Sequence, residues 1–301
     1  MEIQWSLVIF AAFICWGAGT YVAAVAFRGL LGASERIMRP AFVLSAVAVV
    51  AGAVASMTHL GHLDRIFGVL SNPASGIFVE GLSSAVLVVV AAAYLVAAGR
   101  KASSGVLRAL AVVGVVPALV VVFAVGSSYL MVARPAWDVP ALPIASVTAA
   151  LSMGAVTVLA IDAFTARGAR DAAGEERAAS RMGVATLALI GIQAVAVAAY
   201  AASVATAPYQ EASRSAARML AGDMAPLFWL AVVVLGVAVP FAATLAQRRG
   251  LALAASGEAV ARSRAAVTLG VAALCMVVAV IAFRVIMFSL GSSIIDFEFT
   301  L

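Results

Sequence analysis

The chain has only two histidines among its 301 residues, and both lie in one short polar stretch between two long apolar segments. An arginine follows them and a glutamate begins the next apolar segment: His59, His62, Arg65 and Glu80. If the preceding helix continues, the histidines and the arginine, at i, i+3 and i+6, share one face. Histidine accepts a proton near neutral pH and a carboxylate can pass it on. The pattern indicates a proton-handling site, and the alternative is a solvated loop at a membrane boundary.

The same residues argue against a metal centre in this chain. A di-haem cytochrome b needs axial histidines from facing helices, whereas here both histidines lie on one short stretch. Two histidines with only Asp64 or Glu80 nearby are an incomplete zinc site. Cys15 and Cys275 lie inside apolar segments, where cysteine behaves as a small hydrophobic residue, and two thiolates are too few for a cluster. We therefore expect no haem, no metal, no iron–sulfur cluster and no molybdenum in this chain.

The elements that position these residues follow from composition. The chain is 65% hydrophobic and 11% charged, with a mean hydropathy of +1.13, whereas a soluble domain is about 45–50% apolar and about 25% charged. An all-α integral membrane protein is predicted. Eight apolar runs can each cross a hydrocarbon core of about 30 Å as a helix. They are Gln4–Phe27, Pro40–Thr58, Ile77–Gly99, Val106–Val132, Pro143–Thr165, Met182–Ser203, Met224–Ala246 and Ala265–Phe288.

Most of the 19 Lys and Arg residues lie in the loops after the first, third, fifth and seventh runs. The positive-inside rule then places these loops in the cytoplasm and both termini outside. We expect one membrane domain, 1–301, arranged as two four-helix bundles, with kinks at Pro117 and Pro240. The first run lacks a basic flank, so a cleaved signal peptide is not expected. The sequence pI of about 9.8 is explained by short basic loops and needs no nucleic-acid partner.

Two local motifs carry a family resemblance. "HLGHLDRIFGVL" is followed by "SGIFVEG", and after the fourth run comes "SSYLMVARPAWDVPALPIASVTAALSMGA", a Tyr–x–Pro-Ala-Trp–x–Pro pattern. With the eight-helix layout, these resemble the membrane-anchor subunit of dimethyl-sulfoxide-reductase-type molybdoenzymes, within the polysulfide-reductase-like anchors. The chain departs from that family in lacking the usual proline soon after His-Leu-Gly. It also reads "FRVIMFSLG" where an aromatic pair commonly follows the arginine.

The resemblance implies a haem-free anchor in the cytoplasmic membrane that oxidises menaquinol near its outer face. Its partners would be a four-cluster iron–sulfur subunit, which takes the electrons, and a molybdopterin catalytic subunit. Carried over by position, His59 matches the histidine tied to quinol binding, Arg65 the motif arginine and Glu80 the acidic residue of the next helix. His62, Arg284 and Tyr129 are further candidates for quinol contacts.

The remaining outer loops are interpreted as a docking surface for partner subunits. Arg134, Trp137 and Asp138 lie among three prolines that stiffen the segment. Trp137 has two interpretations, an anchor at the membrane interface or a contact with the partner. Residues 208–226 are long enough for a short amphipathic helix, whose alternative place is on the outer leaflet. Arg284 either completes the polar cluster or extends to water.

Two other functions remain open. A secondary transporter would also be a mostly apolar chain, although transporters usually place polar groups near the bilayer midplane. A purely structural anchor would carry no quinone chemistry and would tolerate loss of His59. The terminal substrate would bind a different subunit, and these motifs fix neither the quinone type nor the direction of electron flow.

Overall fold

The computed structural model is all-helical over the residues that it describes, 3–58, 71–166, 173–253 and 259–291. Eight of its helical segments are long and apolar enough to cross a membrane. This confirms the predicted all-α membrane fold. The helices are α1 (Trp5–Leu30), η1 (Glu35–Ile37), α2 (Met38–Met57), α3 (Gly76–Gly99), α4 (Ser104–Val113), α5 (Val115–Ser127), α6 (Ala141–Thr165), α7 (Ala173–Thr206), α8 (Gln210–Leu220), η3 (Leu227–Ala238), α9 (Val239–Leu253) and α10 (Ala259–Ser289).

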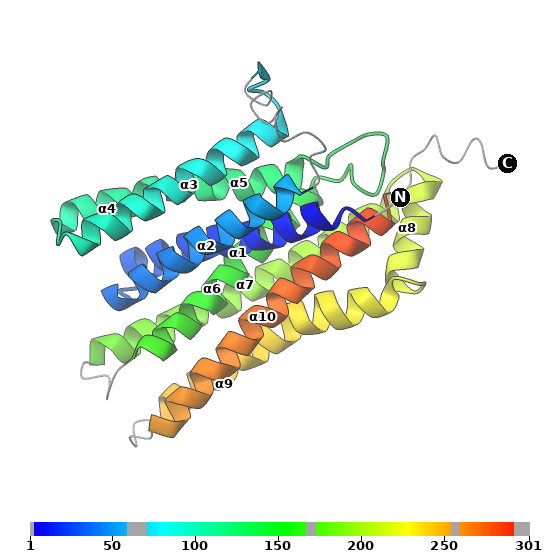
Figure 1. Ribbon diagram of the computed structural model, residues 1–301. Helices are drawn as coiled ribbons and strands as arrows, with labels where there is room; N and C mark the ends of the chain where they lie inside the picture. Colours follow the sequence, from blue (N-terminus) through cyan, green and yellow to red (C-terminus); the bar gives the residue numbers. More distant parts are fainter. Residues whose placement is uncertain (1–2, 59–70, 167–172, 254–258, 292–301) are drawn as a thin grey trace.

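The spans form two bundles that share a seam (Figure 1). In the first bundle α1 packs on α2, α2 on α3, α3 on α5 and α5 on α1. In the second, α6 packs on α7, α7 on α9, α9 on α10 and α10 on α6. The seam consists of α1 and α5 against α6, with α1 also against α10. The expected arrangement as two four-helix bundles is therefore confirmed.

Glycines allow the two central helices to touch at the seam. A Cβ atom on Gly19 of α1 would stand 1.9 Å from the carbonyl oxygen of Ala150, and one on Gly154 of α6 would stand 2.1 Å from that of Gly19. Small residues let helix backbones approach closely in a membrane, where packing rather than the hydrophobic effect holds helices together. The contact between α1 and α6 thus depends on the absence of two side chains.

Both interior prolines lie where regular α-helix is interrupted. The fourth span breaks at Gly114 into α4 and α5, because Pro117 has no N–H to donate to the carbonyl of Val113 and its ring crowds that carbonyl. In the seventh span, η3 is a π-helix, and α-helical geometry resumes at Val239, immediately before Pro240. Sequence reasoning predicted a kink there but not the π-helix.

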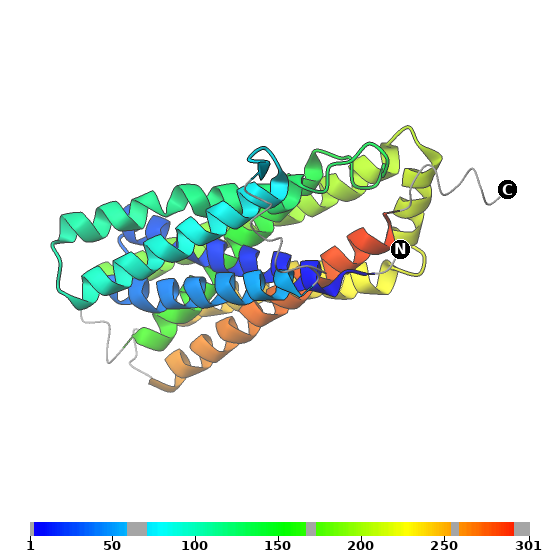
Figure 2. The ribbon, with the colours of Figure 1, turned by 45° about the horizontal axis from the view of Figure 1, so that its top comes forward.

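The helices α7 and α8 extend the bundle at opposite ends. With 34 residues, α7 is about 51 Å long, which exceeds the hydrocarbon thickness. The predicted segment begins only at Met182, because the first turns of α7 carry charged residues and so lie outside the apolar run. The predicted short helix is confirmed as α8, which lies at the same end as the start of α1 and the end of α10 (Figure 2). We call that end the outer end and the opposite end the inner end, following the orientation predicted from the arginines.

Candidate functional site

Glu80 is held at the outer end by a hydroxyl from another helix. The helix α3 begins at Gly76 behind Ser75, whose side chain caps it by accepting a hydrogen bond from the Phe78 N–H at 3.1 Å. This start places Glu80 in the second turn, where its carboxylate accepts a hydrogen bond from the Ser128 hydroxyl at 2.6 Å. Gly76 permits the approach, because a Cβ there would lie 2.5 Å from Ser128 Oγ.

An apolar groove opens beside this pair. It lies between the outer parts of α3 and α5, has a volume of about 560 Å³, and includes Val79, Phe123, Ser127 and Ser128 in its lining. Sites for small molecules are typically concave, about 300–1,000 Å³, and mostly apolar with a few convergent polar groups. The groove meets this description, and its hydroxyl at Ser128 connects it directly to Glu80.

Arg284 and Tyr129 form the adjoining part of the cluster. Arg284 is only 1% exposed, and its Nη2 donates to the Val125 carbonyl at 3.2 Å and to Ser146 Oγ at 3.1 Å. Its guanidinium lies 5.2 Å from the centre of the Tyr129 ring, a cation–π distance. The charge of Arg284 also acts on the carboxylate of Glu80. The outer end therefore brings together three predicted site residues, Glu80, Tyr129 and Arg284.

An aromatic cluster fixes Tyr129. Its ring meets those of Trp137 and Phe288 edge to face, with centroids 5.6 Å apart in each case. Trp137 is 3% exposed, and its indole N–H donates to the Met287 carbonyl at 2.7 Å. The indole thus lies inside the protein, an arrangement that neither interpretation of Trp137 anticipated. Arg134 stacks on this indole at 4.7 Å and donates to the Gly291 carbonyl, while Asp138 is exposed.

The remaining predicted residues, His59, His62 and Arg65, lie outside the described residues, so their roles remain predictions. Conversely, the structure adds hydroxyl groups that no motif indicated. Ser128 holds Glu80, and Ser146 binds Arg284. Ser84, one turn beyond Glu80 on α3, is buried and its hydroxyl has no partner within the described ranges. Serines are common in membrane helices, and only the position of Ser128 next to Tyr129 gave any signal.

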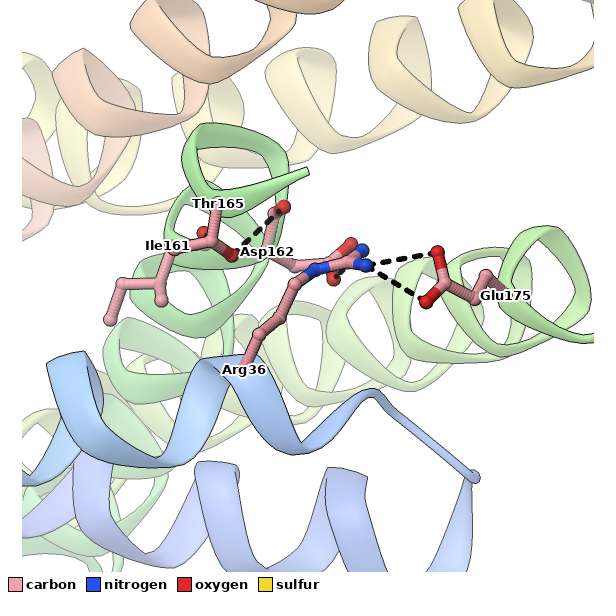
Figure 3. Close-up of polar contacts among 5 residues, drawn as sticks. All are labelled: Arg36, Ile161, Asp162, Thr165 and Glu175. Atoms are coloured by element: carbon pink, nitrogen blue, oxygen red, sulfur yellow. Dashed lines mark hydrogen bonds and ion pairs between the residues drawn. The ribbon is translucent and has the colours of Figure 1, made fainter. Parts of the chain in front are cut away.

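A second polar cluster lies at the inner end (Figure 3). Arg36 of η1 donates to Asp162 at the end of α6 at 3.0 Å and to both carboxylate oxygens of Glu175 at 2.9 Å. The Asp162 side chain is 3% exposed, so its charge is compensated within the protein. This cluster ties the inner extension of α7 to the first bundle, at the opposite end from Glu80.

A model of one protein family, described as polysulphide reductase, NrfD, matches residues 1–290. The chain belongs to the NrfD family. Membership confirms the resemblance drawn from the motifs, and the match covers all eight spans. No curated protein sequence matches the chain.

NrfD proteins are membrane subunits of redox complexes, in which they associate with iron–sulfur and molybdenum catalytic subunits. This agrees with a chain that is a multi-pass membrane protein. Within the described ranges, no group of three or more His, Cys, Asp or Glu side chains could hold a metal ion. Among the described residues, the outer end offers a carboxylate, hydroxyls, a phenol and a buried guanidinium.

Proposed function

We propose that the chain is the quinol-oxidising membrane subunit of a molybdopterin oxidoreductase complex in the cytoplasmic membrane. Menaquinol would bind near the outer end and deliver electrons to an iron–sulfur partner subunit. The observation that carries this proposal is the Glu80 carboxylate, held by Ser128 beside an apolar groove large enough for a quinone ring. NrfD proteins are associated with quinone-interacting redox complexes, which supports the same substrate class.

Quinol oxidation releases two protons as two electrons leave, so each ring hydroxyl needs an acceptor. In this proposal His59 accepts a proton from one hydroxyl, because histidine titrates near neutral pH. Glu80 accepts the proton of the other hydroxyl and releases it outward, and Ser128 orients its carboxylate. Arg284 and Tyr129 supply a fixed positive charge and a phenol that act on Glu80 from behind the groove. His62 and Arg65 are further candidates for contacts with the quinol or with Glu80.

Docking of the iron–sulfur subunit is proposed at the outer loop that carries Arg134 and Asp138. Asp138 is exposed, and its backbone N–H donates to the Arg134 carbonyl at 3.1 Å, which closes a turn. In this arrangement Trp137 supports the loop from beneath through its bond to Met287, rather than by touching a partner.

The test is menaquinol-analogue oxidation by the purified complex carrying Glu80→Gln or His59→Ala, with Glu176→Gln, at an exposed carboxylate in the first turn of α7, as the control. Positioned acid–base groups contribute about 10²–10⁴ in rate. We therefore expect turnover to fall by at least about 100-fold in the first two variants, with normal co-purification of the partner subunits. Wild-type turnover in both variants would favour a purely structural anchor and overturn the proposal.

A transporter finds less support in the described part of the chain. The polar group nearest the middle of the second bundle, Gln193 of α7, already accepts a hydrogen bond from Ser152 of α6. Asp162 is paired with Arg36 at the inner end. Transport sites usually combine interrupted helices with polar groups at the midplane. Here the carboxylates Glu80 and Asp162 lie toward the two opposite ends of the bundle instead.

A further inference from the structure

Arg284 is the largest fully buried side chain of the described residues, yet its hydrogen-bond partners there are all uncharged. They are the Val125 carbonyl, the Ser146 hydroxyl and, at 3.6 Å, the sulfur of Met287. No carboxylate among the described residues comes within ion-pair distance of its guanidinium. A buried charge is costly unless it is paired or fully hydrogen-bonded. The bonds made by Nη1 and Nη2 leave the Nε–H of Arg284 without an acceptor in the described structure.

A small cavity adjoins this guanidinium. It lies between α1, α6, α7, η3 and α10, and its polar lining comes from Cys15, Ser146, Gln193 and Arg284. Its volume of about 20 Å³ is small, but a bound water needs only about 10–15 Å³ together with two to four polar partners. Cavities that stay empty in proteins are apolar, whereas this one has a guanidinium and an amide in its wall.

Gln193 supplies the second unfilled donor. Its amide oxygen accepts the hydrogen bond from Ser152, and within the described ranges its amide nitrogen donates to no acceptor. A water oxygen accepts two hydrogen bonds, so one molecule can take both the Arg284 and the Gln193 donors. The same water can donate to the Ser146 hydroxyl or to the Cys15 sulfur, which are also in the lining.

The backbone beside the cavity is also irregular. Val232, which lines the cavity, belongs to the π-helix η3. Runs of π-helix are rare and are found frequently at functional sites. This second, independent feature lies at the same place as the buried guanidinium.

We propose that this cavity is a binding site for one ordered water molecule, which solvates Arg284 and links it to Gln193. The site joins α10, α7 and α6 inside the second bundle and keeps a positive charge stable behind the outer cluster. It does not depend on quinol chemistry, so it stands or falls separately from the proposed function.

The test is to fill the cavity with a larger side chain and to measure whether the thermal midpoint rises or falls. Ala149 lines the cavity, and Ala149→Val would occupy the space of the water. Filling a dry apolar cavity stabilises a protein, whereas expelling this water strands two donors. We expect the thermal midpoint of the purified full-length chain to fall by several degrees more than in Ala92→Val, the control at an exposed position of α3.

In the Arg284→Met background, the decrease in thermal midpoint caused by Ala149→Val should shrink to that caused by Ala92→Val, because the charge that needs water is gone. An equal effect of Ala149→Val in both backgrounds, or a raised midpoint in the unaltered background, overturns the proposal. If Arg284→Met does not fold, brief radiolysis of the unaltered protein provides the second measurement. Cys15 is 1% exposed, so radicals from bulk water do not reach its thiol. We expect rapid oxidation of Cys15 by radicals from the bound water, and we expect Ala149→Val to suppress it. Absence of that oxidation overturns the proposal.

Discussion

The contact between α1 and α6 makes a strong prediction for Gly154→Ala. The added Cβ would stand 2.1 Å from the Gly19 carbonyl oxygen, and real Cβ atoms essentially never come within 3.0 Å. The two backbones must therefore separate by about 0.9 Å, and no rotamer change can relieve a clash between backbone atoms. Overpacking costs typically 1–3 kcal/mol, and we expect the upper end, about 3 kcal/mol. Replacing glycine by alanine in a helix returns about 1 kcal/mol, which leaves a net loss of about 2 kcal/mol.

The matched control is Gly191→Ala in α7, where an added Cβ meets nothing within 4 Å. This variant should gain up to about 1 kcal/mol from helix propensity alone. Reversible unfolding in mixed micelles, followed by circular dichroism, measures both variants. A loss of about 2 kcal/mol lowers the folded-to-unfolded ratio about 30-fold. Equal stabilities for the two variants would refute the claim that α1 and α6 touch through their backbones.

Three further predictions concern other contacts. Trp137→Phe removes the buried bond to the Met287 carbonyl and should cost about 1–3 kcal/mol of unfolding free energy, whereas Trp5→Phe at a 56% exposed position should cost almost nothing. Asp162→Asn should lower unfolding free energy by about 2 kcal/mol, since it leaves Arg36 with less charge compensation, while exposed Asp138→Asn serves as its control. Hydrogen bonds from Arg218 hold the pKa of Asp223 below its ordinary value of 3.8. The contribution of this pair is therefore complete above about pH 4 and is lost as pH falls further. The protection factors for amide exchange in α8, which correct for the pH dependence of the intrinsic rate, should fall on acidification in the unaltered protein, and in Asp223→Asn they should already be low above pH 4.

The sequence could predict the eight spans because long apolar runs dominate a chain with few charges. It missed the first turns of α7, since Glu175 lies in a charged segment that hydropathy does not mark, although in the structure this segment is helical and Glu175 binds Arg36. The π-helix η3 has no known pattern in hydropathy. For the outer cluster, the sequence predicted Glu80, Tyr129 and Arg284, but not the serines that hold Glu80 and Arg284. A hydroxyl has the same chemistry on every face of a helix, so only packing shows which serine meets which charge.

The helix α6 explains how a nearly uniform apolar chain specifies one packing. Its buried polar residues each bond to a different element: Ser146 to Arg284 of α10, Ser152 to Gln193 of α7, Thr157 to Trp16 of α1, and Asp162 to Arg36 of η1. They span 16 residues, about 24 Å along the helix. Burial of apolar surface cannot fix the register of helices that are surrounded by lipid, whereas interhelical hydrogen bonds and close backbone contacts can. Because α6 carries such a bond near each end and two between them, sliding or rotating it would break all four. The same helix that places Ser146 under Arg284 at the outer end therefore also places Asp162 against Arg36 at the inner end.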